Sequence, residues 1–164
     1  MNSYRSITAF FFVAFSFVSL TAGAQAWRTY EWEYYNIQFE LPEKFTVTTN
    51  TAEALEASAE GIRFALYPFK DSELDGLDLA GFVVKMAEED LNLSQIDEME
   101  LLEFEEMDGG FVSGAKDGLL YMVLGLMDKN SDNNYYAFVA FEEDKQEELV
   151  EDAMEVLLSF DLLK

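Results

Sequence analysis

The chain of 164 residues contains no histidine and no cysteine. Their absence excludes a Ser-His-Asp triad, a cysteine nucleophile, an imidazole general base and any disulfide. Haem thioethers, structural zinc sites and iron–sulfur clusters are excluded for the same reason. The side-chain chemistry that remains is that of carboxylates, hydroxyls and lysine.

Basic residues are also few. The sequence has 10 Lys and Arg against 33 Asp and Glu, which gives a formal net charge of −23. Proteins gain most of their affinity for nucleic acid from Lys and Arg side chains that neutralise phosphates. We therefore expect no nucleic-acid partner, and we expect the surplus of like charge to keep the protein soluble and monomeric.

The first 26 residues have the three-part pattern of a secretory signal peptide. Met1–Arg5 carries one positive charge, Ile7–Leu20 is an apolar run rich in phenylalanine, and the small residues Ala24 and Ala26 suit a signal peptidase. The run has 14 residues, three of them Ser or Thr, whereas a membrane-spanning helix needs roughly 20 apolar residues. We therefore expect cleavage after Ala26 and no membrane span in the mature form.

No cysteine follows the expected cleavage site, which excludes a lipoprotein anchor. The expected location is therefore periplasmic or secreted, in a Gram-negative bacterium. The remaining residues, 27–164, have the length of one domain.

Alternation of apolar and polar residues predicts three strands early in the mature chain. Their apolar positions are Ile37, Phe39 and Leu41, then Phe45 and Val47, then Ile62, Phe64 and Leu66. The first two strands are predicted to form a pair joined by the turn Pro42-Glu43-Lys44. The Ala/Glu-rich segment Thr51–Gly61 is interpreted as a connection.

Two later segments have apolar residues at helical spacing. The first contains Leu79, Phe82, Val83, Met86 and Ala87, and the second, which starts at Glu142, contains Leu149, Ala153, Val156, Leu157 and Phe160. Asp78 is the expected N-cap of the first helix. Acidic residues in the first turn of the second helix interact favourably with its dipole.

Four strands are predicted between these helices: Met99–Glu105, Phe111–Lys116, Leu119–Met127 and Tyr135–Phe141. Tight turns are expected at Asp108-Gly109-Gly110 and Asp117-Gly118, because Asp-Gly between apolar stretches favours a hairpin. A polar loop is expected at Asp128–Asn134. The apolar phase changes between Leu101 and Leu102, which indicates a bulge.

These elements predict the α+β class, with one antiparallel sheet of about six to seven strands and two main helices packed against it. The sequence resembles the PsbP-like fold superfamily, which includes PsbP of photosystem II, a Ran-binding import factor and small bacterial exported proteins. The resemblance rests on Phe39-Glu40-Leu41-Pro42-Glu43-Lys44-Phe45 and on Leu157-Leu158-Ser159-Phe160, and it covers roughly Asn36–Leu163. It implies a binding or assembly module that attaches to another protein and catalyses no reaction.

Two acidic segments have part of the ligand spacing of an EF-hand calcium loop. Asp128, Asn130 and Asp132 start one of them, but Asn133 replaces the required glycine and Val139 replaces the final Glu. We interpret this segment as a solvated hairpin loop.

The other segment places Asp71, Glu73 and Asp75 before Gly76, but Phe82 takes the final ligand position. We interpret it as a loop that leads into the helix N-cap. Weak calcium binding is the alternative.

The acidic clusters Glu88–Asp90, Glu103–Asp108 and Glu142–Glu148 are interpreted as solvated faces. The alternative is an acidic docking face for a basic partner. Two carboxylates several ångströms apart can also hydrolyse a glycosidic bond, but with 33 acidic residues some pair meets that spacing by chance. Because Gly109-Gly110 is assigned to a hairpin, no phosphate-binding loop is predicted.

Aromatic residues are concentrated at the start of the mature chain: Trp27, Tyr30, Trp32, Tyr34 and Tyr35. In a strand the side chains of Tyr30, Trp32 and Tyr34 point to one side and that of Tyr35 points to the other. Tyr and Trp are favoured contact residues at interfaces. We hypothesise that Trp27 and Tyr35 face a partner; the alternative is an edge strand whose aromatic residues pack on the core.

The sequence thus favours an exported, non-enzymatic binding or accessory module with an unidentified protein partner. It indicates no catalytic residue, no cofactor and no metal site. The alternative function is a carboxylate-dependent hydrolase acting on envelope glycans. A deep cleft that holds two acidic side chains of raised pKa would favour the hydrolase.

Overall fold

The computed structural model describes residues 25–70 and 78–163. These residues form two antiparallel sheets and two main helices, so the predicted α+β class is confirmed. The strands are β1 (Trp27–Trp32), β2 (Ile37–Pro42), β3 (Thr46–Asn50), β4 (Leu55–Ala59), β5 (Ile62–Phe69), β6 (Glu100–Glu103), β7 (Met107–Lys116), β8 (Leu119–Asp128), β9 (Asn134–Glu142) and β10 (Asp161–Leu162). The helical segments are α1 (Leu79–Lys85), the π-helical turn η2 (Met86–Asp90), the 3-10 turn η3 (Glu143–Lys145) and α2 (Gln146–Leu158).

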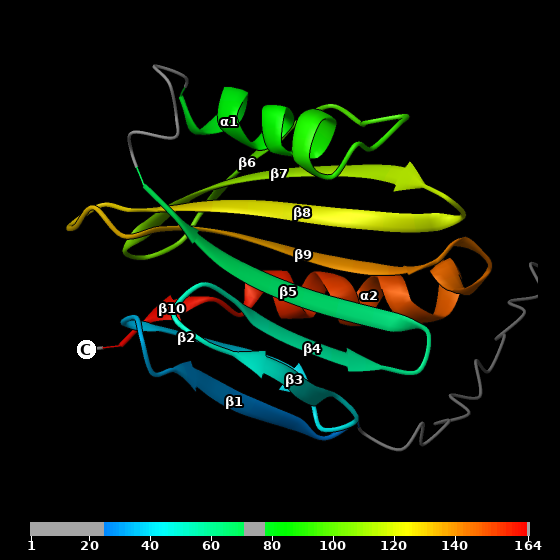
Figure 1. Ribbon diagram of the computed structural model, residues 1–164, viewed down its shortest axis with the longest axis horizontal. Coiled ribbons are helices and arrows are strands. Elements are labelled where there is room, and N and C mark those ends of the chain that lie inside the picture. Colours follow the sequence, from blue (N-terminus) through cyan, green and yellow to red (C-terminus); the bar gives the residue numbers. More distant parts are fainter. Residues whose placement is uncertain (1–24, 71–77, 164) are drawn as a thin grey trace, which may run out of the picture.

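The larger sheet has seven strands in the order β3-β4-β5-β9-β8-β7-β6, and the smaller sheet has three in the order β1-β2-β10 (Figure 1). Neighbouring strands are antiparallel in both. Asp117 and Gly118 have positive φ angles of 52° and 78° and form the predicted tight turn between β7 and β8. The long central strands are therefore joined by short local connections.

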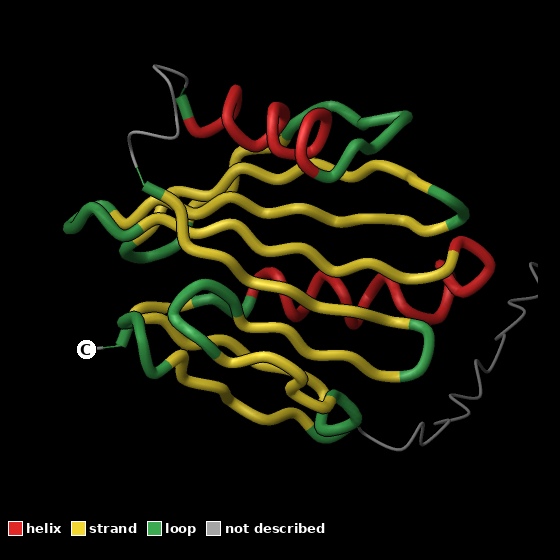
Figure 2. Tube along the Cα trace, viewed as in Figure 1, coloured by secondary structure: helices red, strands yellow, loops and turns green. Residues whose placement is uncertain are grey.

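The two faces of the larger sheet are covered differently. On the inner face, side chains such as Phe64, Leu124 and Val139 pack in one core with α2 and the smaller sheet. On the outer face, Val112 and Val123 pack against α1. Figure 2 shows the two helices in red with yellow strands between them. Residues that alternate along β7, β8 and β9 therefore enter two separate cores.

Two glycines allow α1 to pack closely on the outer face. Gly110 on β7 lies opposite Gly125 on β8. A Cβ atom at Gly125 would lie 2.4 Å from Cγ2 of Val83, and one at Gly110 would lie 3.3 Å from the same atom. The turn predicted at Asp108-Gly109-Gly110 is therefore wrong, because these residues belong to β7. Gly110 makes room for the helix, Gly109 lies against Phe104 and Leu102, and the chain turns at residues 104–106.

Three further strand predictions are wrong. The segment Thr51–Gly61 contains β4, in which Leu55 and Ala57 are buried, and the weak strand preference of alanine hid it. β2 and β3 do not pair with each other, because they belong to different sheets. β6 pairs with β7 in continuous register over its described length, so the bulge expected between Leu101 and Leu102 is not present there.

The helix predictions are confirmed. Asp78 caps α1, and its Oδ1 accepts a hydrogen bond from the backbone N of Gly81 at 2.8 Å. α2 buries Leu149, Ala153 and Val156 against the inner face of the larger sheet. No helix within the described ranges is long and apolar enough to cross a membrane.

Candidate functional site

The outer face of the larger sheet is only partly covered, because α1 lies over β7 and β8. Beside the helix lies a set of side chains that we call the tyrosine face: Arg63, Tyr67, Tyr121, Tyr136 and Phe138. Arg63 is exposed, three of the aromatic side chains are half-buried, and Tyr121 is buried. This open part of the sheet is therefore built from aromatic rings, three of which end in a hydroxyl.

The rings of the tyrosine face form a continuous series of contacts. Tyr67 and Tyr136 lie opposite each other on β5 and β9, with ring centroids 5.1 Å apart and planes at 23°. Phe138 lies 6.4 Å from Tyr67 and 5.6 Å from Tyr121. Cross-strand aromatic pairs of this kind stabilise a sheet and hold the rings in place. The positions of the hydroxyl groups are therefore fixed by the sheet.

Hydrogen bonds fix the edge of the tyrosine face that borders β3 and β4. Thr49 Oγ1 donates to Glu56 Oε2 at 2.7 Å, and Tyr67 Oη donates to Glu56 Oε1 at 2.8 Å. These two hydrogen bonds lower the pKa of Glu56. Burial, the hydrogen bond to Glu56 and the charge of Glu56 raise the pKa of Tyr67. Glu56 is therefore an anion that positions Tyr67, and a lowered pKa is the opposite of what a general acid needs.

A hollow of about 450 Å³ lies where the tyrosine face meets α1 and η2. We call it the acidic hollow, and its polar lining consists of Glu53, Tyr67, Lys85, Glu89, Asp90 and Tyr136. The rings of Phe69 and Phe82, stacked with centroids 4.2 Å apart, form part of its apolar wall. Burial, followed by the charge of Asp90, raises the pKa of Tyr136 to about 12.

A second groove, of about 400 Å³, lies at the other side of the sheet between α2 and the β7–β8 hairpin. Its apolar lining includes Phe111, Met122, Phe141 and Met154. These residues belong to the core that α2 shares with the inner face or pack against it. The groove is therefore an edge of that core.

The aromatic residues at the start of the chain are part of the fold. Trp32 is fully buried, and the Tyr35 ring lies 4.5 Å from it and 5.7 Å from Tyr135. Tyr35 Oη donates a hydrogen bond to the backbone oxygen of Ala52 at 2.8 Å. Trp27 is half-buried against the same core. This packing favours an aromatic edge strand over the hypothesis that Trp27 and Tyr35 face a partner.

The alternation of side chains predicted for the aromatic residues at the start of the chain ends earlier than expected. Tyr30 stacks on Phe39 with centroids 6.0 Å apart, and β1 stops at Trp32. A turn follows, so Tyr34 does not share the buried side with Trp32 and is 53% exposed. The turn thus separates the buried aromatic residues from the exposed one.

The two segments with partial EF-hand spacing differ in whether the structure describes them. Asp128 Oδ1 accepts a hydrogen bond from the backbone N of Asn130 at 2.8 Å, and its Oδ2 accepts one from Ser131 Oγ. Asp128 therefore stabilises a hairpin loop, as interpreted from the sequence. Within residues 25–70 and 78–163 no group of three His, Cys, Asp or Glu is placed to hold a metal ion. The other candidate loop, Asp71–Gly76, lies outside the described residues.

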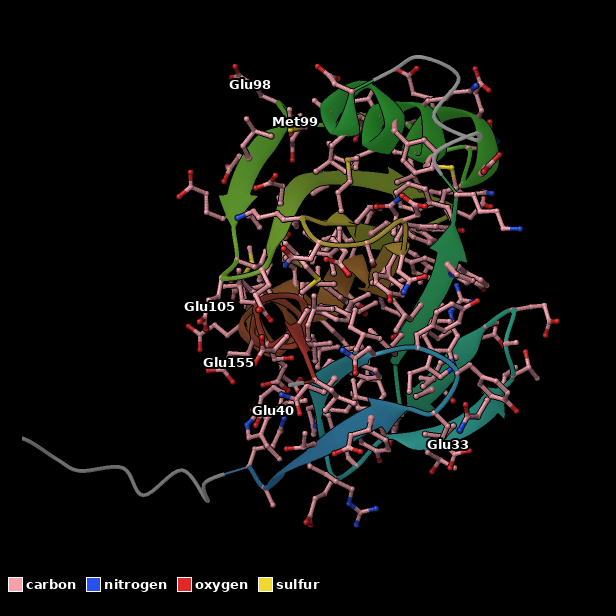
Figure 3. All side chains as sticks on the ribbon, turned by 90° about the vertical axis from the view of Figure 1, so that its left-hand side faces the viewer. Glu33, Glu40, Glu98, Met99, Glu105 and Glu155 are labelled. Atoms are coloured by element: carbon pink, nitrogen blue, oxygen red, sulfur yellow. The ribbon has the colours of Figure 1, made fainter. Side chains whose placement is uncertain are left out.

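Most acidic side chains are spread over the surface. Figure 3 labels Glu33, Glu40, Glu98, Glu105 and Glu155, and it shows the last three pointing outward at one side of the protein. All five are exposed. Of the three acidic clusters predicted as solvated faces, Glu88–Asp90 is the one that contributes carboxylates to the acidic hollow. Glu89 and Asp90 thus have surroundings that the sequence pattern did not reveal.

Comparison with solved structures identifies the fold. The Ran-binding protein Mog1p of Saccharomyces cerevisiae superposes with a TM-score of 0.58 and 9% identity, covering 86% of this chain and 97% of Mog1p. The cyanobacterial PsbP protein CyanoP of Synechocystis sp. PCC 6803 superposes with a TM-score of 0.57 and 12% identity, covering 86% and 95%. No protein-family model and no curated protein sequence matches the chain. The structural matches confirm the resemblance drawn from the sequence: the chain has the Mog1/PsbP-like fold.

Proposed function

We propose that the protein is an exported, non-enzymatic binding or accessory module whose tyrosine face receives a protein partner. The observation that carries the proposal is the half-buried stack of Tyr67, Tyr136 and Phe138 on the part of the sheet beside α1. Tyrosine gives a large apolar contact area with a polar end and loses little rotamer entropy when it is bound. The pairing with Glu56 orders this surface in advance, which reduces the entropy lost on association.

The fold supports a binding role without specifying the partner. Mog1p, which has the same fold, is a Ran-binding protein. At 9% identity this likeness concerns architecture, so the partner of the present chain has to be inferred from its own surface.

Export is supported by the sequence pattern of residues 1–26. β1 starts at Trp27, so cleavage after Ala26 would leave all the described strands complete. The mature protein would then act in the periplasm or outside the cell, as a soluble protein without a lipid anchor.

Hydrolysis of glycans is not favoured by any observation on the site. The three carboxylates of the acidic hollow, Glu53, Glu89 and Asp90, are all exposed to solvent. A glycosidase needs one carboxyl group that its surroundings keep protonated. Carboxylates as exposed as these three do not form the enclosed site in which such a group is found.

Site-specific cross-linking in the producing cell tests the proposal. A photo-cross-linking amino acid replaces Arg63 on the tyrosine face in one variant and Glu155 on α2 in the other. Both positions are exposed, so position 155 controls for cross-links that form in chance encounters. We expect a discrete cross-linked species from position 63 in the envelope fraction and none from position 155. Equal cross-linking from both positions, or cross-linking from position 155 alone, would contradict the proposal.

Intact-mass measurement of the same purified protein tests export. We expect a chain that begins at Trp27. A mature species that retains residues 1–26 would contradict the signal-peptide part of the proposal.

A further inference from the structure

The acidic hollow is shaped by an unusual helical turn. In η2 the backbone N of Leu91 bonds to the oxygen of Met86 at 3.0 Å, five residues back. The consecutive residues Glu89 and Asp90 of this turn both line the hollow, together with Lys85 at the end of α1. Single π-helical turns are often found at functional sites. The end of this helical segment thus places two carboxylates at the border of the tyrosine face.

The charge in the hollow is unbalanced. Glu53, from the loop between β3 and β4, adds a third carboxylate, whereas Lys85 is the one basic residue of the lining. In the described part of the chain none of these four side chains is within ion-pair distance of an opposite charge. The hollow therefore has a net negative charge that an incoming cation would neutralise.

The walls of the hollow suit a flat cation better than a compact one. Tyr67 and Tyr136 contribute aromatic surface and hydroxyl oxygens, and Phe69, Phe82 and Met86 contribute apolar surface. No hydrogen bond of the Tyr136 hydroxyl is found among the described residues, so its oxygen is available as an acceptor. A guanidinium group is planar, weakly hydrated, stacks on aromatic rings and donates several hydrogen bonds at once. An ammonium group holds its water more strongly.

We propose that the acidic hollow binds an arginine side chain of a basic segment of the partner, an inference that rests on the proposed function of the tyrosine face. The guanidinium lies between the carboxylates of η2 and Glu53, against the rims of Tyr67 and Tyr136. The rest of the partner segment continues over the stacked rings towards Arg63. Charge complementarity selects the segment, since the site is negative and the whole chain carries a net charge of −23.

Amide spectra of the isotope-labelled protein can follow the binding of short peptides at physiological ionic strength. The probes are identical Gly/Ser peptides with a central arginine, lysine or citrulline; citrulline has nearly the shape of arginine without the charge. We expect the arginine peptide to bind at least about fivefold more tightly than the citrulline peptide, with lysine between them. The amide shifts should be concentrated around Glu89, Asp90 and Tyr136.

A pair of double variants separates the site from the general negative charge of the protein. Glu89→Gln/Asp90→Asn removes two charges from the hollow, and Glu147→Gln/Glu148→Gln removes two from consecutive exposed residues of α2. We expect the first variant to weaken arginine-peptide binding by about tenfold and the second by less than about twofold. Unchanged amide spectra away from the substitutions control for folding.

Equal losses in the two variants, or equal binding of the arginine and citrulline peptides, would overturn the inference. The cross-linking experiment at position 63 is independent of this outcome. A cross-link at position 63 without any preference for arginine would refute the arginine site and leave the proposed binding function standing. If position 63 gave no cross-link and the arginine peptide showed no preference, the binding function and the arginine site would both be refuted.

Discussion

Tyr135 and Tyr136 are consecutive residues of β9, yet they lie on opposite faces of the same sheet. Tyr135 is completely buried beside Trp32 and Tyr35 on the inner face. Tyr136 is half-buried in the tyrosine face and stacks on Tyr67. The inner aromatic side chains meet a helix and a second sheet, whereas the outer ones are covered only in part: Tyr136 packs against Phe69 and against Phe82 of α1 and remains half-buried.

The two faces of the sheet differ in how completely other elements cover them. Both faces carry stacked aromatic rings, and Phe39 lies 5.0 Å from Phe64 on the inner face much as Tyr67 lies 5.1 Å from Tyr136 on the outer face. On the inner face α2 and the smaller sheet exclude water. On the outer face the rings of Tyr67, Tyr136 and Phe138 are ordered but remain partly accessible. We therefore expect substitutions on the inner face to affect folding and those on the outer face to affect binding.

The largest effect is expected from truncating a buried inner ring. Phe39→Ala should lower the free energy of unfolding by about 3–5 kcal/mol, because it removes a completely buried ring and leaves a cavity. Phe138→Ala, on the outer face, is the matched change at a half-buried phenylalanine and should lower it by about 1–2 kcal/mol. Denaturant unfolding of both variants measures the difference. Equal losses would mean that the two faces are equally part of the core.

The next effect concerns the aromatic start of the chain. Trp27→Ala together with Tyr35→Ala should lower the free energy of unfolding by more than about 2 kcal/mol, since Tyr35 packs on Trp32 and Tyr135. Cross-linking from position 63 should persist in the folded fraction. A stable double variant that loses its cross-link would instead place the partner at the start of the chain.

Alkaline pH should destabilise the protein through both faces. The pKa values of Tyr35, Tyr67 and Tyr135 are raised, chiefly by burial, and that of Tyr136 is raised to about 12. A tyrosine with a higher pKa in the folded chain holds its proton more tightly there. Its contribution to stability is therefore complete below about pH 10 and is lost as the pH rises towards 12.

Denaturant unfolding at a series of pH values measures this loss. Replacing Tyr67 and Tyr136 with phenylalanine should reduce the loss of stability above about pH 10 without abolishing it, because the inner tyrosines still titrate. A free energy of unfolding that does not change over this pH range would contradict the raised pKa values of these tyrosines.

The smallest effect distinguishes the two neighbouring tyrosines themselves. The Tyr135 hydroxyl is buried and has no hydrogen-bond partner in the described part of the chain. Tyr135→Phe should therefore raise the free energy of unfolding by up to about 1 kcal/mol, because it removes an unpaired buried polar group. Tyr136→Phe should change it by less than about 0.5 kcal/mol. A clear loss of stability in Tyr135→Phe would show that its hydroxyl is paired.

Local sequence patterns predicted most of the elements that build the fold. Alternation identified Ile37–Leu41, helical spacing identified both helices, and Asp78 was identified as a cap from its residue type. These signals act over a few residues and do not depend on distant partners. Where the signal was ambiguous, as at Gly109-Gly110, a glycine that admits a packed helix is indistinguishable by sequence from one that turns the chain.

The candidate site could not be predicted in the same way. Tyr67 and Tyr136 are distant in sequence and meet because β5 pairs with β9, which no local pattern specifies. Glu53 and Asp90 approach the same hollow from a loop and from a π-helical turn that has no sequence signature. The tyrosines within otherwise apolar strands were the available signal. That signal does not distinguish the two faces, because Tyr135 is completely buried while its neighbour Tyr136 is half-buried.

The central claim is that the outer face binds while the inner face holds the fold, and Tyr136→Ala tests it most directly. The measurement is the yield of the cross-link from position 63 in this variant, with the free energy of unfolding determined on the same protein. The account predicts that the yield falls by about tenfold while the free energy falls by only about 1–2 kcal/mol. An unchanged yield, or a destabilisation as large as that of Phe39→Ala, would contradict it.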